Sequence, residues 1–64
     1  MQMTYVATIR NTRTKETKAI TVENDSPMQA HKQVMWEYTT NDEDILNIRD
    51  NEGKLVFDLN KGFK

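Results

Sequence analysis

The chain has 64 residues, of which ten are acidic and nine are basic, and it contains no cysteine. A domain of this length buries only about 60% of the surface of its unfolded chain, and without cysteine it has neither disulfides nor thiolate zinc sites. Its 36% hydrophobic and 30% charged residues are typical of a folded globular chain. We expect one folded domain over residues 1–64, either a monomer or a homodimer in which a partner subunit adds stability.

The sequence predicts no targeting or membrane segment. The N-terminal residues lack a basic region followed by an apolar core, and no apolar run approaches about 18 residues. We therefore expect neither a signal peptide nor a membrane span, and we expect the protein to be cytoplasmic.

The first 22 residues have the pattern of a β-hairpin. Residues 4–10 are rich in β-branched and aromatic side chains, and Tyr5, Ala7 and Ile9 share one face at a period of two. Residues 18–22 place Ile20 and Val22 on a common face. The polar segment 11–15 between these strands lacks glycine, which disfavours a tight two-residue turn. We expect a hairpin over 4–22 with a longer or bulged connection.

The strongest local signal is a helix start. Ser26 can cap the helix, Pro27 suits its first position, and Gln29 can complete a capping box. The helix is predicted over 27–38, because residues 39–42 are β-branched or polar. Its expected apolar stripe consists of Met28, His31, Val34, Met35 and Tyr38, with Ala30 at the margin. At about 100° per residue, Trp36 lies about 80° from Met28 and outside this stripe.

A second hairpin is predicted over 44–59. Leu46 and Ile48 fall on one face, Gly53 suits the left-handed position of a turn, and the following apolar residues alternate: Leu55, Phe57 and Leu59. Residues 60–64 form a short tail, for which two outcomes stay open: it frays, or Phe63 folds back onto the sheet. The predicted fold is an α+β domain of the ββαββ type, a four-stranded antiparallel sheet with one helix packed on one face.

The sequence offers little material for catalysis or for cofactor and metal binding. His31 is the only histidine, and we interpret it as a core or boundary residue bonded to a backbone group. The acidic run 42–44 with Asp50 and Glu52 lacks the spaced ligands and central glycine of a calcium loop. Two glycines, Gly53 and Gly62, cannot form a glycine-rich phosphate loop. We expect no enzymatic activity, no cofactor and no metal.

Charge is distributed unevenly along the chain. Residues 1–22 have four basic residues and one acidic residue, whereas residues 23–58 have nine acidic residues and three basic ones. Two interpretations stay open: ordinary solubilising charges on a small surface, or a charged pole that steers a partner.

Two classes of function compete. In the first, the protein binds a host protein or another protein through Trp36 and an acidic segment, Asp42, Glu43 and Asp44, since exposed aromatic residues are enriched in binding hot spots. Alternatively, Trp36 covers a sheet edge or Phe63. In the second class, nucleic acid binds the first hairpin through its basic residues, Arg10, Arg13, Lys15 and Lys18. The sequence pI near 5.7 argues against this second class.

Several short runs resemble the open reading frames of small bacteriophage and prophage proteins. They are Asp25-Ser26-Pro27, Ala30-His31-Lys32, Asp44-Ile45, Ile48-Arg49-Asp50 and Gly53-Lys54-Leu55-Val56, so the similarity covers roughly residues 4–59. These runs mark a helix start and a hairpin turn, and the resemblance therefore implies a shared fold more than a shared activity. Many small phage proteins bind a host protein and block or redirect it, which favours the first class. The resemblance assigns no functional residue.

Overall fold

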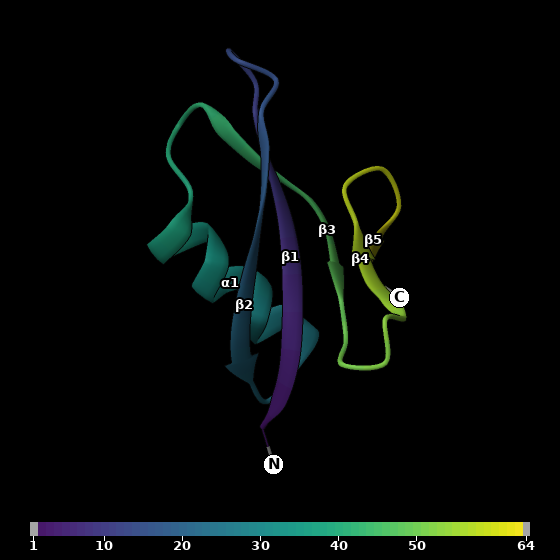
Figure 1. The fold of residues 1–64 in the computed structure, drawn as a ribbon. Helices are drawn as coiled ribbons and strands as arrows, with labels where there is room; N and C mark the ends of the chain where they lie inside the picture. Colours follow the sequence, from purple (N-terminus) through teal and green to yellow (C-terminus); the bar gives the residue numbers. More distant parts are fainter. Residues whose placement is uncertain (1, 64) are drawn as a thin grey trace.

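The computed structural model of the protein describes residues 2–63. In chain order the elements are β1 Met3–Asn11, β2 Thr17–Asn24, α1 Pro27–Tyr38, β3 Glu43–Arg49, β4 Leu55–Asp58 and β5 Gly62–Phe63. The strands form one antiparallel sheet in the order β2-β1-β3-β4-β5. Helix α1 crosses one face of this sheet and contacts β1, β2 and β3 (Figure 1). The predicted α+β architecture is confirmed, except that the sheet has five strands in place of four.

The additional strand forms where a short tail was predicted. The Lys61 amide donates to the Asp58 carbonyl at 3.1 Å, and Gly62 has a φ of 79°, which glycine adopts without steric cost. The chain thereby reverses, and Phe63 pairs with Phe57 of β4. Of the two outcomes left open for the tail, the structure has the one in which Phe63 folds back onto the sheet. A strand of two residues is too short to show a period-two pattern, so it could not be predicted from the sequence.

The first hairpin has the longer connection that its lack of glycine predicted. The Asn11 amide donates to the Glu16 carbonyl, and the Lys15 amide donates to the Asn11 carbonyl, both at 2.8 Å. Lys15 adopts a φ of 68°, the left-handed conformation that glycine would favour. A polar side chain supports this loop, because Asn11 Oδ1 accepts from the amides of Arg13 and Thr14.

Helix α1 has the predicted bounds. Ser26 is the N-cap, its Oγ accepting from the Gln29 amide at 3.3 Å, and Pro27 follows it. At the other end Thr39 has extended backbone angles, and its Oγ1 donates to the Met35 carbonyl at 2.6 Å. The local polar residues therefore set both ends of the helix.

The buried side of α1 differs from the predicted stripe. Ala30 and Val34 are fully buried, whereas Met28 and Met35 are 54% and 44% exposed. Ala30 has a short side chain that allows close approach to the sheet, so the helix rests on the Ala30–Val34 line. This placement rotates both methionines toward solvent, and Tyr38 is also partly exposed. The prediction that all three belong to the core is wrong.

Two register shifts correct the prediction for the second hairpin. Between β1 and β3, Thr8 pairs with Asn47 and Ile9 pairs with Ile45, which leaves Leu46 as an extra residue. Ile45 and Ile48 consequently enter the core in place of Leu46 and Ile48. A second shift follows Ile48, where β4 has its own extra residue. The resulting core consists of Tyr5, Ala7, Ile9, Val22, Ala30, Val34, Ile45, Ile48 and Phe57.

Candidate functional surface

Trp36 is the most exposed large apolar side chain among residues 2–63, at 80%. Its position follows from the packing of α1, because Ala30 and Val34 point to the sheet and Trp36 lies on the opposite side of the helix. Phe63 packs against His31 and Phe57. The interpretation in which Trp36 covers Phe63 or a sheet edge therefore does not hold.

A shallow hollow of about 420 Å³ lies beside Trp36 at the C-terminal end of α1. We call its lining the Trp36 surface, which consists of Met35, Trp36, Thr39, Thr40, Asn41 and Glu43. A smaller hollow of about 170 Å³ lies next to it and shares Met35, Thr39 and Glu43. Leu59, which is 46% exposed, also lines the smaller hollow. The exposed apolar area thus extends from the helix toward the end of β4.

Hydrogen bonds fix the loop that forms one wall of the Trp36 surface. The Thr40 amide donates to Glu43 Oε1 at 3.0 Å, and the Glu43 amide donates to the Thr40 carbonyl at 3.1 Å. Glu43 is also within 3.2 Å of Lys18 Nζ, and only 11% of its side chain is exposed. The hydrogen bond from Lys18, followed by that from Thr40, lowers the pKa of Glu43 below its ordinary value. This carboxylate therefore supports the wall and contributes little exposed charge.

The other two acidic residues predicted for partner binding occupy different environments. Asp42 Oδ2 lies 3.5 Å from Arg13 Nη1, and the Asp42 carbonyl accepts from both the amide and the hydroxyl of Thr12. Asp44 is exposed in β3, opposite Arg10, and lines the smaller hollow. Of the three, Glu43 lines both hollows, Asp44 lines the smaller one, and Asp42 faces the first hairpin.

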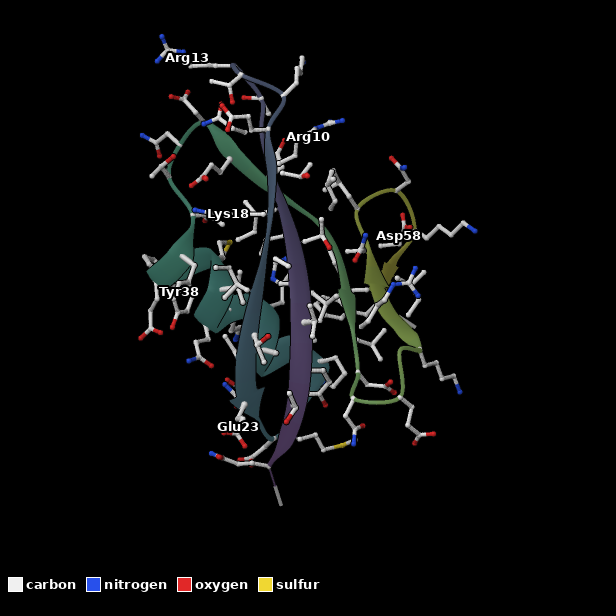
Figure 2. The ribbon with its side chains drawn as sticks, in the orientation of Figure 1. Arg10, Arg13, Lys18, Glu23, Tyr38 and Asp58 are labelled. Carbon is white, nitrogen blue, oxygen red and sulfur yellow. The ribbon has the colours of Figure 1, made fainter. Side chains whose placement is uncertain are left out.

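The basic and acidic segments of the sequence meet in the structure. Arg13 and Lys18 of the first hairpin form ion pairs with Asp42 and Glu43, respectively. Arg13 extends from the tip of the hairpin and Lys18 lies lower on its side near the end of the helix (Figure 2). Two of the four basic residues of the first hairpin are thus paired with two acidic residues that follow the helix.

The four basic residues predicted for nucleic-acid binding do not share one face. In the β1–β2 register Lys18 is opposite the core residue Ile9, whereas Arg10 alternates onto the other face of the sheet. Arg10 Nε is buried without a hydrogen-bond partner, and Lys15 is exposed at the hairpin tip. The hairpin therefore presents dispersed cations, two of them already paired.

His31 lies at the edge of the core, as predicted, but its neighbours are aromatic rings. Its ring centroid is 4.6 Å from that of Phe57 and 5.4 Å from that of Phe63. The predicted backbone hydrogen bond is not among the hydrogen bonds of residues 2–63. Burial lowers the pKa of His31 below its ordinary value, because the charged imidazolium loses hydration there. The described residues contain no group of three or more potential ligands that could hold a metal ion.

The sequence patterns did not identify four members of the Trp36 surface, which are Met35, Thr39, Thr40 and Asn41, or Leu59 in the smaller hollow beside it. Met35 was placed in the core stripe, Leu59 was placed on the buried side of a strand, and Thr39 was interpreted only as a helix stop. The exposure of Met35 could have been predicted from Ala30. A helix approaches a sheet most closely on the side that carries a short side chain, and Met35 lies away from the side of Ala30. Leu59 is exposed because β4 ends at Asp58 and Leu59 lies in the turn that leads to β5, whereas the alternating pattern continued the strand to Leu59.

Comparisons of the chain with known protein families, with curated proteins and with solved structures gave no match. Within residues 2–63 no helix has the length and apolar character needed to cross a membrane.

Proposed function

We propose that this domain is a non-enzymatic protein-binding module, and that its partner contacts the Trp36 surface. The observation that carries the proposal is the 80% exposure of Trp36 on a helix that is otherwise anchored by Ala30 and Val34. A tryptophan held outside the core contributes no packing to the fold, while it is among the residues most often found at binding hot spots.

The surroundings of Trp36 support a protein partner. Met35 and the adjacent hollow provide an adaptable apolar contact, because methionine side chains fit varied shapes. Polar residues of the 39–41 loop line the other side of the hollow and offer hydrogen bonds at its rim. Together they form an apolar centre with a polar border, the arrangement of a small protein interface.

The exposed charges near this surface favour a partner with basic groups around its contact site. Glu37 follows Trp36 on the helix and is exposed. Asp44, which lines the smaller hollow, is also exposed. Such rim charges raise the rate of association and reject acidic partners, although they add little net affinity. The resemblance to small phage proteins suggests that the partner is a host protein, which the module inhibits or redirects in the cytoplasm of the host cell.

Nucleic-acid binding through the first hairpin is the alternative. It has less support, since Arg13 and Lys18 are within 3.5 Å and 3.2 Å of carboxylates and the remaining two cations point in different directions. A phosphate backbone would have to displace these ion pairs.

The proposal is tested by capture and titration. Tagged wild-type protein is incubated with bacterial lysate with and without nuclease treatment, and the captured protein is identified, purified and titrated against defined variants. Trp36→Ala should keep its fold and weaken binding by about 2 kcal/mol or more, the loss typical of a truncated hot-spot aromatic. Met28→Ala is the matched control, because Met28 is an exposed apolar residue at the other end of the same helix.

Each alternative outcome has a distinct meaning. Equal binding by wild type and Trp36→Ala would show that the partner docks elsewhere. Recovery of nucleic acid alone, with loss of all captured material after nuclease treatment, would support the alternative function. In that case Lys15→Ala should weaken binding while Trp36→Ala does not.

A further inference from the structure

Strand β2 forms one edge of the sheet, and its outer side is open. Among the strands of residues 2–63, it pairs with β1 alone. Because the Asn11 amide donates to the Glu16 carbonyl, the alternation of an antiparallel ladder directs the backbone groups of every second β2 residue away from β1. These residues are Thr17, Ala19, Thr21 and Glu23, and all four are exposed.

This edge has few of the features that usually prevent strand addition: its one lysine, Lys18, is paired with Glu43, and α1 lies over one face only. β2 spans eight residues without proline, and its register with β1 contains no bulge. Of its four outward-directed residues only Glu23 is charged. Natural edge strands are commonly short, kinked or lysine-rich, and the opposite edge of this sheet, β5, has only two residues. β2 is therefore the edge on which another strand can form a full hydrogen-bond ladder.

The helix extends over this edge. Figure 1 shows the C-terminal end of α1 passing behind β2 and projecting beyond its outer side, and Figure 2 shows Tyr38 on the projecting part. Tyr38 is 40% exposed, and Ile20 of β2 is only partly buried against the core. A strand added to β2 would lie beside Ile20 and beneath the projecting turn of α1, which would cover one of its faces.

The same projection favours a single extended segment over a second copy of the chain as the occupant. Antiparallel pairing of two β2 strands requires a two-fold axis normal to the sheet and just outside β2. Figure 1 shows the end of α1 beyond the outer side of β2, and such an axis would bring the helix of the second copy to the same face of the sheet, next to this end. A single extended segment lies in the sheet layer and brings no second helix.

We propose that the outer edge of β2 binds an extended segment of a protein partner as a further antiparallel strand. Antiparallel pairing continues the pattern of the whole sheet and forms well-aligned hydrogen bonds. The residue of the segment opposite Ile20 is apolar, because it adds to the edge of the core. The residue beside the exposed carboxylate of Glu23 is basic or neutral. This site is separate from the Trp36 surface and does not depend on it.

The test uses peptides selected without bias. A display library of random decapeptides is selected on immobilised wild-type protein, and the enriched peptides are synthesised and titrated into isotope-labelled protein. We expect peptides that alternate apolar or β-branched residues with polar ones. Their binding should slow amide hydrogen exchange at Thr17, Ala19, Thr21 and Glu23, while the amides of Ile20 and Val22 are protected before and after addition.

Two variants define the role of the backbone. Ala19→Pro removes an outward-directed amide at a position where an edge strand tolerates proline, and it should weaken peptide binding by about tenfold or more. Ala19→Ser retains the amide and serves as the matched control. Trp36→Ala should bind these peptides as the wild type does, which separates this site from the Trp36 surface.

Four results would overturn the proposal. They are the absence of enriched peptides, equal binding by folded Ala19→Pro, exchange changes at the Trp36 surface without changes in β2, and a dimer in which the outward β2 amides are already protected. The hydrogen-exchange map of the wild-type protein decides the question even if Ala19→Pro does not fold.

Discussion

The Lys18 ammonium lies 3.2 Å from the Glu43 carboxylate, so that one ion pair connects β2 with the first residue of β3 across the intervening strand β1. Glu43 additionally accepts a hydrogen bond from the Thr40 amide at 3.0 Å. One carboxylate thus connects the first hairpin, the loop after α1 and the start of β3. Because the loop after α1 and Glu43 itself line the Trp36 surface, the ion pair links the stability of the fold to the shape of that surface.

We expect Glu43→Ala to lower the melting temperature more than Glu43→Gln, because glutamine retains an oxygen that accepts from Thr40. Thermal unfolding followed by circular dichroism at pH 7 measures both. Asp42→Asn is the control: the Arg13–Asp42 pair is exposed, and Thr12 bonds to the Asp42 backbone carbonyl, which the substitution preserves. It should change the unfolding free energy by less than about 0.5 kcal/mol. Equal melting temperatures for Glu43→Ala and the wild type would contradict this role.

Acid should remove the contribution of Glu43 in a defined range. Its folded-state pKa is lowered, so the unfolded chain binds the proton first as the pH falls. The stabilisation is therefore complete above the unfolded pKa of about 4.3 and is lost as the pH falls through the lower folded-state value. The difference in melting temperature between wild type and Glu43→Gln should shrink when unfolding is repeated below pH 4.3.

The helix and the two hairpins could be predicted because their signals are local. Ser26 and Pro27 mark the helix start, and the glycine-free loop 11–15 indicated a longer connection; both were confirmed. Local signals did not predict which side of the helix packs against the sheet. Apolar residues occupy more than half of its circumference, and the contact with Ala30 and Val34 was selected by packing against a sheet with two bulges.

The choice between Val34 and Met35 as the core residue gives a direct test of the helix orientation. Val34 is fully buried, so Val34→Ala should cost about 2 kcal/mol through lost burial and the cavity that it leaves. Met35 is 44% exposed, and Met35→Ala should cost less than about 1 kcal/mol. Chemical denaturation of the two variants compares these values. A larger loss for Met35→Ala would restore the stripe predicted from the sequence.

The candidate surface was predictable only in part. Trp36 was identified because its helical angle departs from that of every residue expected in the core, and this is a local property. The pairing of Arg13 with Asp42 and of Lys18 with Glu43 joins residues far apart in the sequence. It depends on β1 lying between β2 and β3, and charge counts along the chain carry no information about that order.

The packing of His31 against Phe57 predicts a loss of stability in mild acid. Burial lowers the folded-state pKa of His31, so the unfolded chain takes up a proton at a higher pH than the folded chain does. Stability is unaffected by this group above the unfolded pKa of about 6.5 and declines as the pH falls below it, until His31 is also protonated in the folded state. Urea unfolding at several pH values between about 7.5 and 5 measures the slope.

The matched variant for this experiment is His31→Phe, which retains an aromatic ring beside Phe57 and Phe63 but does not titrate. Its stability should change less than that of the wild type over the same pH range. The two proteins share all their other titratable residues, so those residues contribute similarly to both curves. Parallel curves for the two proteins would show that His31 is not the group responsible.

The exposure of Trp36 predicts its fluorescence, and this measurement needs no binding partner. Trp36 is the only tryptophan in the chain, and at 80% exposure its indole is surrounded mainly by water. The free protein should emit near the wavelength of free tryptophan, and iodide should quench the emission efficiently. Phe63→Ala should leave both properties unchanged, because Phe63 packs against His31 and Phe57 on the sheet side of the helix.

A blue-shifted emission that iodide does not quench, in a protein shown to be monomeric, would mean that Trp36 is covered within its own chain. The same titration with the captured partner should then give no further shift, whereas an exposed Trp36 that anchors the complex should shift to the blue and become protected as the partner binds.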